Sequence, residues 1–299
     1  MSDPDAGALV EPFVAHRGLL FTVAYEMLGS AADAEDVVQE SWLRWEGLGG
    51  GGRAEVRDPR AYLVRTVTRQ ALNRLRSLSR RREEYVGEWL PEPLLTGRDV
   101  AEDIELAESV SIAMLTVLET LGPAERAVFV LREVFDVPYD EIGDAVGKSP
   151  ATVRQIARRA RAHVAARRPR VAVERDEQRA VVERFLAAAD GGDLQGLLDV
   201  LAPDVVLVAD GGGLVPAVRH PVLGAEKVGF LLSRFRAMAP SMVIEPAMVN
   251  GAPGARIDDS GRLDAVVSVD VVDGLVSRVY IMRNPEKLGG LDRAAPLAR

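Results

Sequence analysis

The segment from Tyr139 to Val164 constrains the fold of this chain more than any other feature. Its first half, Tyr139 to Val146, has the spacing of a short amphipathic helix, and Gly147 can take the left-handed conformation that ends such a helix. Ser149 then offers an N-cap side chain, and Pro150 stands at the first helical position, where a missing amide costs nothing. A helix end and a helix start this close together predict a tight corner, the helix-turn-helix.

The second helix of this corner divides into an apolar stripe and a basic face. The apolar residues recur at spacings of three and four and should be buried: Val153, Ile156, Ala157, Ala160 and Val164. The other face has small and polar residues at its leading end and arginines behind, which suits a DNA major groove. The expected DNA contacts are Ser149, Ala151, Thr152, Arg154, Gln155, Arg158, Arg159 and Arg161. The alternative is a solvated, arginine-rich helix in an ordinary helical hairpin.

Charge is distributed unevenly along the chain. The net charge of −8 argues against a protein that coats nucleic acid indiscriminately. Residues 60–82 nevertheless contain eight arginines and no acid, and residues 148–170 contain one lysine, seven arginines and no acid. Two separated basic helices indicate two contact points on a nucleic acid.

Composition excludes several classes of protein. The sequence has no cysteine and no run of eighteen apolar residues, and its start lacks the basic-then-apolar order of a signal peptide. We therefore expect a soluble, cytoplasmic protein with no membrane partner and no disulfide. The sequence contains no recognisable metal-ligand cluster, phosphate-binding loop or nucleophile triad. We accordingly expect no metal, no cofactor, no catalytic residue and no enzymatic activity.

Apolar spacing predicts a helical first half. Helices are expected over 12–28, 32–45, 59–82, 111–121 and 123–135, in addition to the helix-turn-helix, with a flexible loop at glycines 49–52. The core stripe of the third helix should be Val64, Val67, Ala71, Leu75 and Leu78. Residues 85–110 contain two prolines in three residues, Pro91 and Pro93, and predict an extended, stiff connector.

From Glu174 onward the pattern predicts a separate α+β domain. Two helices are expected within 177–202 and one over 224–238. Strands are expected over 205–208, 242–249, 265–272 and 276–281. The last two strands flank Asp273-Gly274, which is a hairpin turn signal.

Three stretches of the helical half resemble the extracytoplasmic-function sigma factors of the sigma-70 family. Residues 34–45 (AEDVVQESWLRW) are similar to the segment that docks on the beta-prime clamp helices of core RNA polymerase. Residues 58–65 and 72–76 resemble the helix that captures the promoter −10 element, and 139–164 the module that reads the −35 element. The resemblance implies a sigma factor whose partners are core RNA polymerase and promoter DNA.

The resemblance also assigns residues to these surfaces. It implies polymerase contacts at Asp36, Gln39, Glu40 and Leu43. It implies −10 contacts at Arg65, Thr66, Arg69, Gln70, Asn73, Arg76 and Arg80. An acidic helix suits a basic partner surface. The alternative for its acids is an ordinary solvated face. For Trp42 and Trp45, core packing is the favoured interpretation.

Three further stretches resemble the sigma-J-like group, whose members carry a fused SnoaL-like (NTF2-like) domain. They are the linker residues Trp89, Leu90, Pro91, Glu92, Pro93 and Leu94, then Asp210, Gly211, Gly212 and Gly213, and finally Asn284, Pro285, Glu286, Lys287 and Leu288. Leu214 departs from the group, where a basic residue is expected. Trp89 is expected either in a groove of the C-terminal domain or against the nearby helical domain.

The resemblance implies a multi-domain fold, with two all-α domains followed by an α+β NTF2-like cone. The expected bounds are 7–84 for sigma region 2, 85–110 for the linker, 111–170 for sigma region 4 and 175–288 for the cone. The cone is expected to modulate sigma activity in cis.

Two other functions stay open at this point. One is a stand-alone helix-turn-helix regulator, which would normally bind paired half-sites as a dimer. The other is a bifunctional protein whose C-terminal cavity binds a small ligand or performs isomerase-type chemistry. Asp210 and His220 are the candidate catalytic groups, and simple loop roles compete for both.

Overall fold

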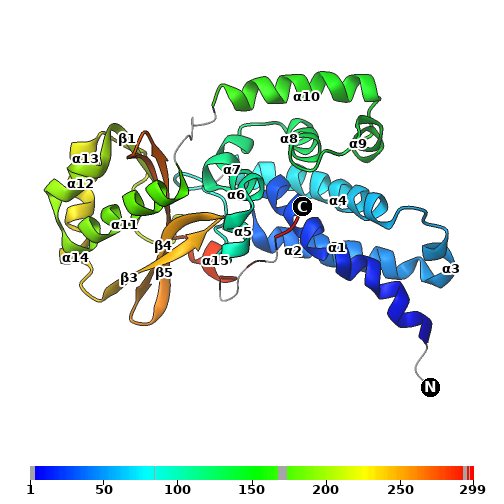
Figure 1. The fold of residues 1–299 in the computed structure, drawn as a ribbon, viewed down its shortest axis with the longest axis horizontal. Helices are drawn as coiled ribbons and strands as arrows, with labels where there is room; N and C mark the ends of the chain where they lie inside the picture. The colour runs from blue at the N-terminus through cyan, green and yellow to red at the C-terminus, as the bar shows by residue number, and fades with distance from the viewer. Residues whose placement is uncertain (1–3, 84, 168–173, 292–294, 296) are drawn as a thin grey trace. The chain divides into compact units, whose positions relative to one another are not determined.

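The computed structural model describes residues 4–83, 85–167, 174–291, 295 and 297–299 (Figure 1). The chain divides into two compact units. The first comprises Met1–Arg81, Met114–Arg167 and Pro296–Arg299, and the second comprises Arg82–Ala113 and Arg168–Ala295. The expected linker therefore packs with the C-terminal part. Residues 84 and 170, which end two of the expected domains, lie outside the described residues.

The first half of the first unit consists of α1 (Pro4–Leu28), α2 (Ala31–Gly47), α3 (Gly49–Ala54) and α4 (Pro59–Glu83). The hydroxyl of Ser30 caps α2 by accepting from Asp33 N at 3.1 Å, and Asp58 Oδ1 accepts from Ala61 N at 2.9 Å where α4 begins. The expected stripe of α4 is buried at all five positions. The three helices predicted in this stretch are confirmed.

The prediction of a flexible loop at glycines 49–52 is wrong, because these residues begin α3. Glycine opposes helix formation by only about 1 kcal/mol per residue relative to alanine. Leu48, just before them, already has helical φ and ψ of −68° and −19°. Arg53 Nε also donates to Gly49 O at 3.3 Å. The freedom of glycine was therefore a poor reason to exclude a helix.

The second half of the first unit contains the helix-turn-helix. The elements are α7 (Ile112–Leu118), α8 (Pro123–Phe129), the π-helical turn η1 (Val130–Val134), α9 (Tyr139–Val146) and α10 (Pro150–Ala165). Gly147 ends α9 at φ 69°, and Ser149 Oγ accepts from Thr152 N at 3.3 Å to begin α10. All five residues of the predicted stripe of α10 are buried. The helix-turn-helix is thus confirmed in its turn, cap and core face.

The second unit is built on a six-stranded sheet in the order β2-β1-β6-β5-β4-β3. The strands are β1 (Leu201–Asp210), β2 (Val222–Leu223), β3 (Met242–Val249), β4 (Ala252–Asp259), β5 (Arg262–Val272) and β6 (Leu275–Met282). β1 and β6 are parallel, and the other neighbours are antiparallel. Asp273 and Gly274 form the predicted hairpin turn, both with positive φ.

Helices cover one face of this sheet. They are α11 (Arg175–Gly191), α12 (Leu194–Val200), α13 (Ala225–Ser233) and α14 (Phe235–Met238). Phe185, Leu197 and Val228 from the first three of them pack with Val267 of β5 in one core. The α+β class of the C-terminal part is therefore as expected, although the single helix predicted over 224–238 is interrupted at Arg234.

The opposite face of the sheet is covered by the linker. Adjacent strand residues point to opposite faces, so Val266 lies on the other side from Val267 and packs with Leu90, Ile112 and Leu288. Leu288 belongs to α15 (Pro285–Leu288). The prediction of an extended connector is confirmed only to Gly97, because α5 (Arg98–Glu102) and α6 (Ile104–Val110) follow.

Candidate functional site

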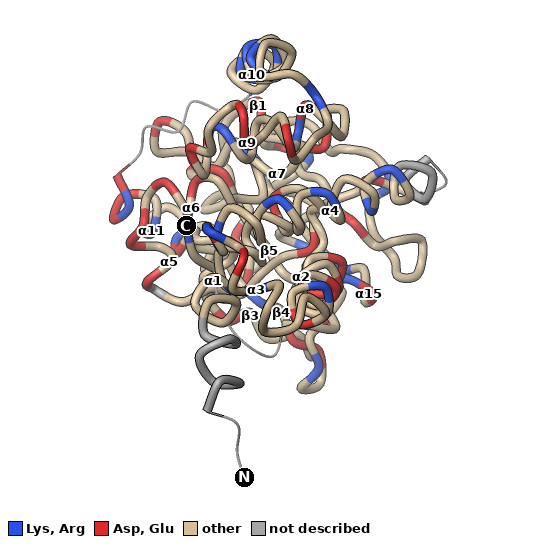
Figure 2. Tube along the Cα trace, turned by 90° about the vertical axis from the view of Figure 1, so that its right-hand side faces the viewer, with Lys and Arg blue, Asp and Glu red and all other residues tan. Residues whose placement is uncertain are grey.

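The basic face of α10 is open to solvent. All eight residues expected to contact DNA are exposed. The Lys and Arg positions gather on this helix in Figure 2. Arg161 Nε lies 3.7 Å from Glu133 Oε1, and Ser149 is already used as the cap of the helix. The exposed face of α10 therefore carries arginine side chains along its length and small or polar residues at its first turn.

Tyr139 is a feature of this surface that the sequence interpretation missed. Two guanidinium groups lie over its ring, with Arg132 Cζ 4.9 Å and Arg154 Cζ 5.6 Å from its centroid. Such cation–π contacts restrict a flexible arginine. Tyr139 therefore positions Arg154, and no spacing rule in the sequence indicates that pairing.

The basic helix α4 borders a cavity of about 280 Å³. Five of the residues expected to contact the −10 element line it: Arg65, Thr66, Arg69, Gln70 and Asn73. Arg44 and Tyr62 complete the lining and were not singled out from the sequence. Tyr62 is the single aromatic residue of α4, and this could have marked it as a stacking platform. Its ring also packs against buried Trp45 at 5.7 Å and carries Arg65 Cζ at 5.7 Å.

The lining residues differ in how free they are. Gln70 is 7% exposed, and its amide, in the orientation that satisfies its surroundings, accepts from Ser41 Oγ at 3.0 Å and donates to Glu40. Arg69 Nη2 donates to Asp144 O at 2.7 Å. Arg76 is exposed and does not line the cavity, but it donates a hydrogen bond to Asn73 Oδ1 at 3.3 Å. The side chain of Arg80 lies outside the described residues.

The four residues expected to contact polymerase lie exposed on α2, as Asp36, Gln39, Glu40 and Leu43. Leu43 is 58% exposed and places an apolar side chain among the acids of this face. Asp36 Oδ2 accepts from Arg74 Nη2 at 2.9 Å. Trp45 is buried and Trp42 packs edge-on against Phe13 at 5.0 Å, which agrees with core packing for both.

The three sigma-J-like signatures meet at one buried ion pair in the second unit. Lys287 Nζ lies 2.7 Å from Asp210 Oδ2 and donates to Leu90 O at 2.6 Å. It also lies 3.3 Å from the ring centroid of Trp89. Leu90 N donates to Asp210 Oδ2 at 2.9 Å and Tyr85 OH to Asp210 Oδ1 at 2.5 Å. We call this set the linker clamp: Tyr85, Trp89, Leu90, Asp210 and Lys287.

Burial governs the chemistry of the clamp. Asp210 and Lys287 have side chains that are 0% and 4% exposed. The pKa of Tyr85 is raised, first by burial and then by its hydrogen bond to Asp210, so its phenol remains a donor. Trp89 thus lies in the C-terminal domain, which decides between its two expected positions.

The glycines after Asp210 are required by close packing. Gly212 has φ 63°, and a Cβ there would lie 2.5 Å from Asn284 Nδ2. A Cβ at Gly211 would lie 2.5 Å from Val215 O. Asn284 Nδ2 in turn donates to Tyr85 OH at 2.8 Å. Leu214, the departure from the group, is 58% exposed and takes no part in the clamp.

Beyond the clamp, the linker pairs with the edge of the sheet. Leu95 forms a bridge with Val249 of β3, and Thr96 N donates to Met248 O at 3.0 Å. Asn250 is buried, with Oδ1 accepting from Leu94 N at 2.8 Å and Nδ2 donating to Val110 O at 2.7 Å. Pro91, Pro93 and Leu94 are buried and Glu92 is half-buried. The sheet therefore holds the whole segment from Trp89 to Thr96.

The candidate catalytic groups are not arranged for catalysis. The Asp210 carboxylate accepts four hydrogen bonds, from Tyr85, Leu90 N, Gly212 N and Lys287. These bonds occupy its lone pairs and leave none for a substrate. His220 is an exposed residue in the segment before β2. Asp210 therefore has a structural role: it caps its own loop, as the simple loop interpretation expects, and it also binds the linker and Lys287.

Among the described residues, no helix is both long and apolar enough to cross a membrane. Within the same part of the chain, no group of three or more His, Cys, Asp or Glu is placed to hold a metal ion.

Comparison with known proteins gives consistent matches along the chain. Residues 13–81 match the family model Sigma-70 region 2, and residues 111–164 match Sigma-70, region 4. ECF RNA polymerase sigma factor SigJ of Mycobacterium tuberculosis (strain ATCC 25618 / H37Rv) is 37% identical over 308 residues, which is 97% of each protein. The probable ECF RNA polymerase sigma factor SigI of the same strain is 33% identical over 93% of each. The crystal structure of M. tuberculosis SigJ superposes with a TM-score of 0.75 at 35% identity, covering 95% of this chain and 99% of that one.

Proposed function

Since this chain belongs to the extracytoplasmic-function sigma factors, which direct promoter-specific transcription initiation, we propose how its surfaces share that function. The family binds core RNA polymerase and promoter DNA. In this chain, α10 reads the −35 element, α4 holds the melted −10 element, α2 docks on polymerase, and the second unit sets the activity through the linker.

The cavity beside α4 carries the proposal for the −10 element. Melting a promoter step costs a few kcal/mol, so the protein has to bind the exposed single strand. A base that stacks on an aromatic ring gains about 1–3 kcal/mol. Tyr62 supplies that ring, while Arg65 and Asn73 offer contacts to phosphates and base edges. Arg69 would exchange its bond with Asp144 O for a phosphate.

The proposal for α10 rests on exposure and on preorganisation. Arg154, Arg158 and Arg159 are exposed on the face opposite the buried stripe. The smaller Ala151 and Thr152 stand at the leading turn, where a recognition helix approaches the base edges. Phosphate contacts by the arginines would give position, and contacts at the leading turn would give sequence preference.

Polymerase docking rests on α2. Leu43 and Gln39 stand exposed beside the acids Asp36 and Glu40. An apolar residue with an acidic rim suits a basic protein surface such as the beta-prime clamp helices.

Regulation in cis rests on the linker clamp. The second unit holds the linker by a buried ion pair, by backbone pairing to β3 and by Asn250. The linker joins the two sigma regions in sequence. Whether it is bound to the second unit or released therefore limits the distances and orientations that the two regions can adopt. A separate anti-sigma factor is then not needed for that control.

Run-off transcription with permanganate footprinting tests this division of functions. The chain is mixed with core polymerase and a cognate promoter, and unpaired thymines report opening. We expect Tyr62→Ala to lower opening while polymerase binding is kept, and Tyr62→Phe, the matched control, to behave as the native chain. Equal opening by the alanine variant would exclude base capture at this cavity. Promoter-specific binding by the chain alone, without polymerase, would instead support a stand-alone regulator.

A further inference from the structure

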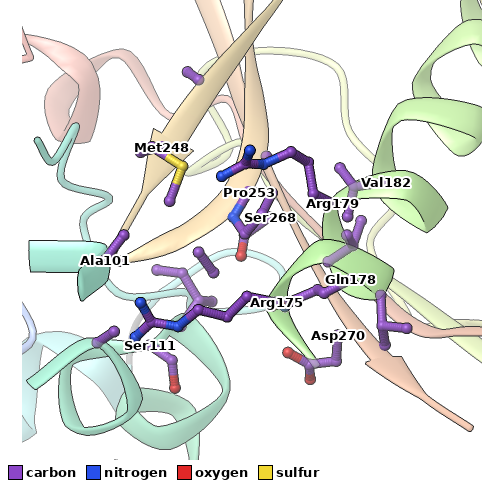
Figure 3. Close-up of a pocket in the computed structure, with 18 of the residues that line it drawn as sticks. Ala101, Ser111, Arg175, Gln178, Arg179, Val182, Met248, Pro253, Ser268 and Asp270 are labelled. Carbon is purple, nitrogen blue, oxygen red and sulfur yellow. The ribbon is translucent and has the colours of Figure 1, made fainter. Parts of the chain in front are cut away.

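A second, larger cavity lies wholly within the second unit. It has a volume of about 890 Å³, which is within the range of small-molecule sites. Its walls come from three places: the linker helices α5 and α6, the first half of α11, and the strands beside the β3–β4 turn (Figure 3). The cavity therefore lies at the end of the sheet, next to the β3–β4 turn, between α11 and the linker helices, and residues from both faces of β5 border it.

The most informative group in this cavity is the carboxyl of Asp270. Its side chain lines the cavity and the residue is only 9% exposed. Oδ2 accepts from Tyr280 OH at 2.9 Å. Among the described residues Oδ1 has no hydrogen-bond partner, and the nearest basic residue is Arg278, its register partner on β6, which favours the charged form of the carboxyl from beyond ion-pair distance. Ser268, two residues earlier on the same face of β5, is 4% exposed and its hydroxyl is likewise unbonded among the described residues. A buried carboxylate that has one neutral donor and no ion-pair partner is costly, and a cationic ligand in the cavity would offset that cost.

The other charges of the lining favour a cation. Five carboxylates and two guanidinium groups border the cavity: Glu102, Glu108, Glu174, Glu183 and Asp270, with Arg175 and Arg179. Figure 3 shows Arg175 and Arg179 extending from α11 over the same space that Asp270 faces. Both arginines are exposed, so water screens their charge and their long side chains are able to move aside. Asp270 is buried, and its field is screened least.

The remaining lining is largely apolar. Val182 and Leu186 of α11 line it together with Ile112, Met248 and Val271. These walls suit a hydrocarbon or aromatic body. From this combination we propose that the cavity binds a small organic cation, an amine with an apolar body, whose charged group pairs with Asp270 and bonds Ser268.

The cavity lies beside both segments of the second unit that connect it in sequence to the first unit. Its lining includes Ser111 to Ala113, just before the chain enters the first unit, and Glu174 and Arg175, soon after it returns. An occupant would contact both of these segments.

Calorimetric titration of the full chain tests the proposal with three matched probes. They are 4-phenylbutylamine, 4-phenylbutanol and 4-phenylbutyrate, which share a body and differ in the polar group. We expect the amine to bind at least about tenfold more tightly than the other two, which corresponds to about 1.4 kcal/mol. Binding of the carboxylate as tightly as the amine, or no amine binding at millimolar concentration, would overturn the assignment.

Variants locate the binding. Asp270→Asn should lose at least tenfold in amine affinity, by the same conversion of about 1.4 kcal/mol, whereas Glu226→Gln, an exposed acid of α13 outside the lining, should lose none. Gln178→Trp fills the cavity from α11 and should abolish binding without touching Asp270. If the Asn variant does not fold, the Trp variant decides. Native amine affinity in either folded variant would place the ligand elsewhere and refute the site.

Discussion

Lys287 Nζ lies 2.7 Å from Asp210 Oδ2, with both side chains almost completely buried. The two residues come from α15 and the end of β1, and both bond the linker at Leu90. Removal of one partner of such a pair leaves the other as an uncompensated buried charge.

Loss of the lysine should therefore be costly. We predict that Lys287→Met destabilises the chain by about 3–5 kcal/mol, the usual cost of breaking a buried pair. Urea denaturation measures it, and Lys227→Met, at an exposed position of α13, is the control. The double variant with Asp210→Asn should cost less than the sum of the two single variants. A loss within the error of Lys227→Met would contradict the prediction.

The close packing of the glycines after Asp210 can be tested by comparing Gly212 with Gly261, a glycine in another turn. Gly212 and Gly261 both have positive φ, but a Cβ would meet Asn284 only at Gly212, since nothing lies within 4 Å at Gly261. We predict that Gly212→Ala lowers the melting temperature clearly more than Gly261→Ala, which carries only the backbone strain. Equal shifts would mean that contact with Asn284 is unimportant.

Tyr139 is predicted to act through Arg154. Replacement by leucine keeps an apolar side chain but removes the cation–π contact, which is worth about 0.5–1 kcal/mol at exposed sites. Transcription from a promoter with an intact −35 element should fall several-fold in Tyr139→Leu and be retained in Tyr139→Phe. With the −35 element scrambled, the difference between the variants should disappear. Loss of activity in the phenylalanine variant would assign the effect to the hydroxyl instead.

Asp270 should make stability depend on pH. Burial raises the pKa of its carboxyl to about 6. The unfolded chain, with a pKa of about 3.9, loses the proton first, so stability falls as the pH rises from about 4 to about 6 and is constant above. The expected loss is about 3 kcal/mol, at 1.36 kcal/mol for each pKa unit.

The variant Asp270→Asn isolates this effect. Its stability relative to the native chain should rise across the same pH window, as measured by urea midpoints. A difference between the two proteins that is independent of pH would contradict a raised pKa at Asp270.

The sequence predicted local elements well where one strong signal acted alone. Gly147, Ser149 and Pro150 form the turn and cap as expected, because positive φ, side-chain capping and the missing amide each have a single local cause. The strand β4 was missed because Pro253 and Gly254 have low strand propensity. Its pairing with β3 and β5 on both sides overrides that propensity.

The sequence did not predict those parts of the sites that depend on contacts between residues far apart in the chain. The three signatures at Trp89, Asp210 and Lys287 were recognisable, but their meeting at one ion pair depends on a sheet that joins residues far apart in sequence. Arg44 was missed for the same reason, because it lines the cavity beside α4 from another helix, α2. The burial of Gln70, which reduces its availability to DNA, depends on its neighbour Ser41 in α2.

The central claim is that the second unit controls sigma activity by holding the linker. Run-off transcription by core polymerase with the native chain, Lys287→Met and Trp89→Ala tests it most directly, at saturating chain and on a panel of promoter variants. We predict that both variants change the amount of transcript several-fold while the order of promoter preference stays that of the native chain. Native output from both variants, with the linker shown to be released by hydrogen exchange at Leu90, would contradict the claim.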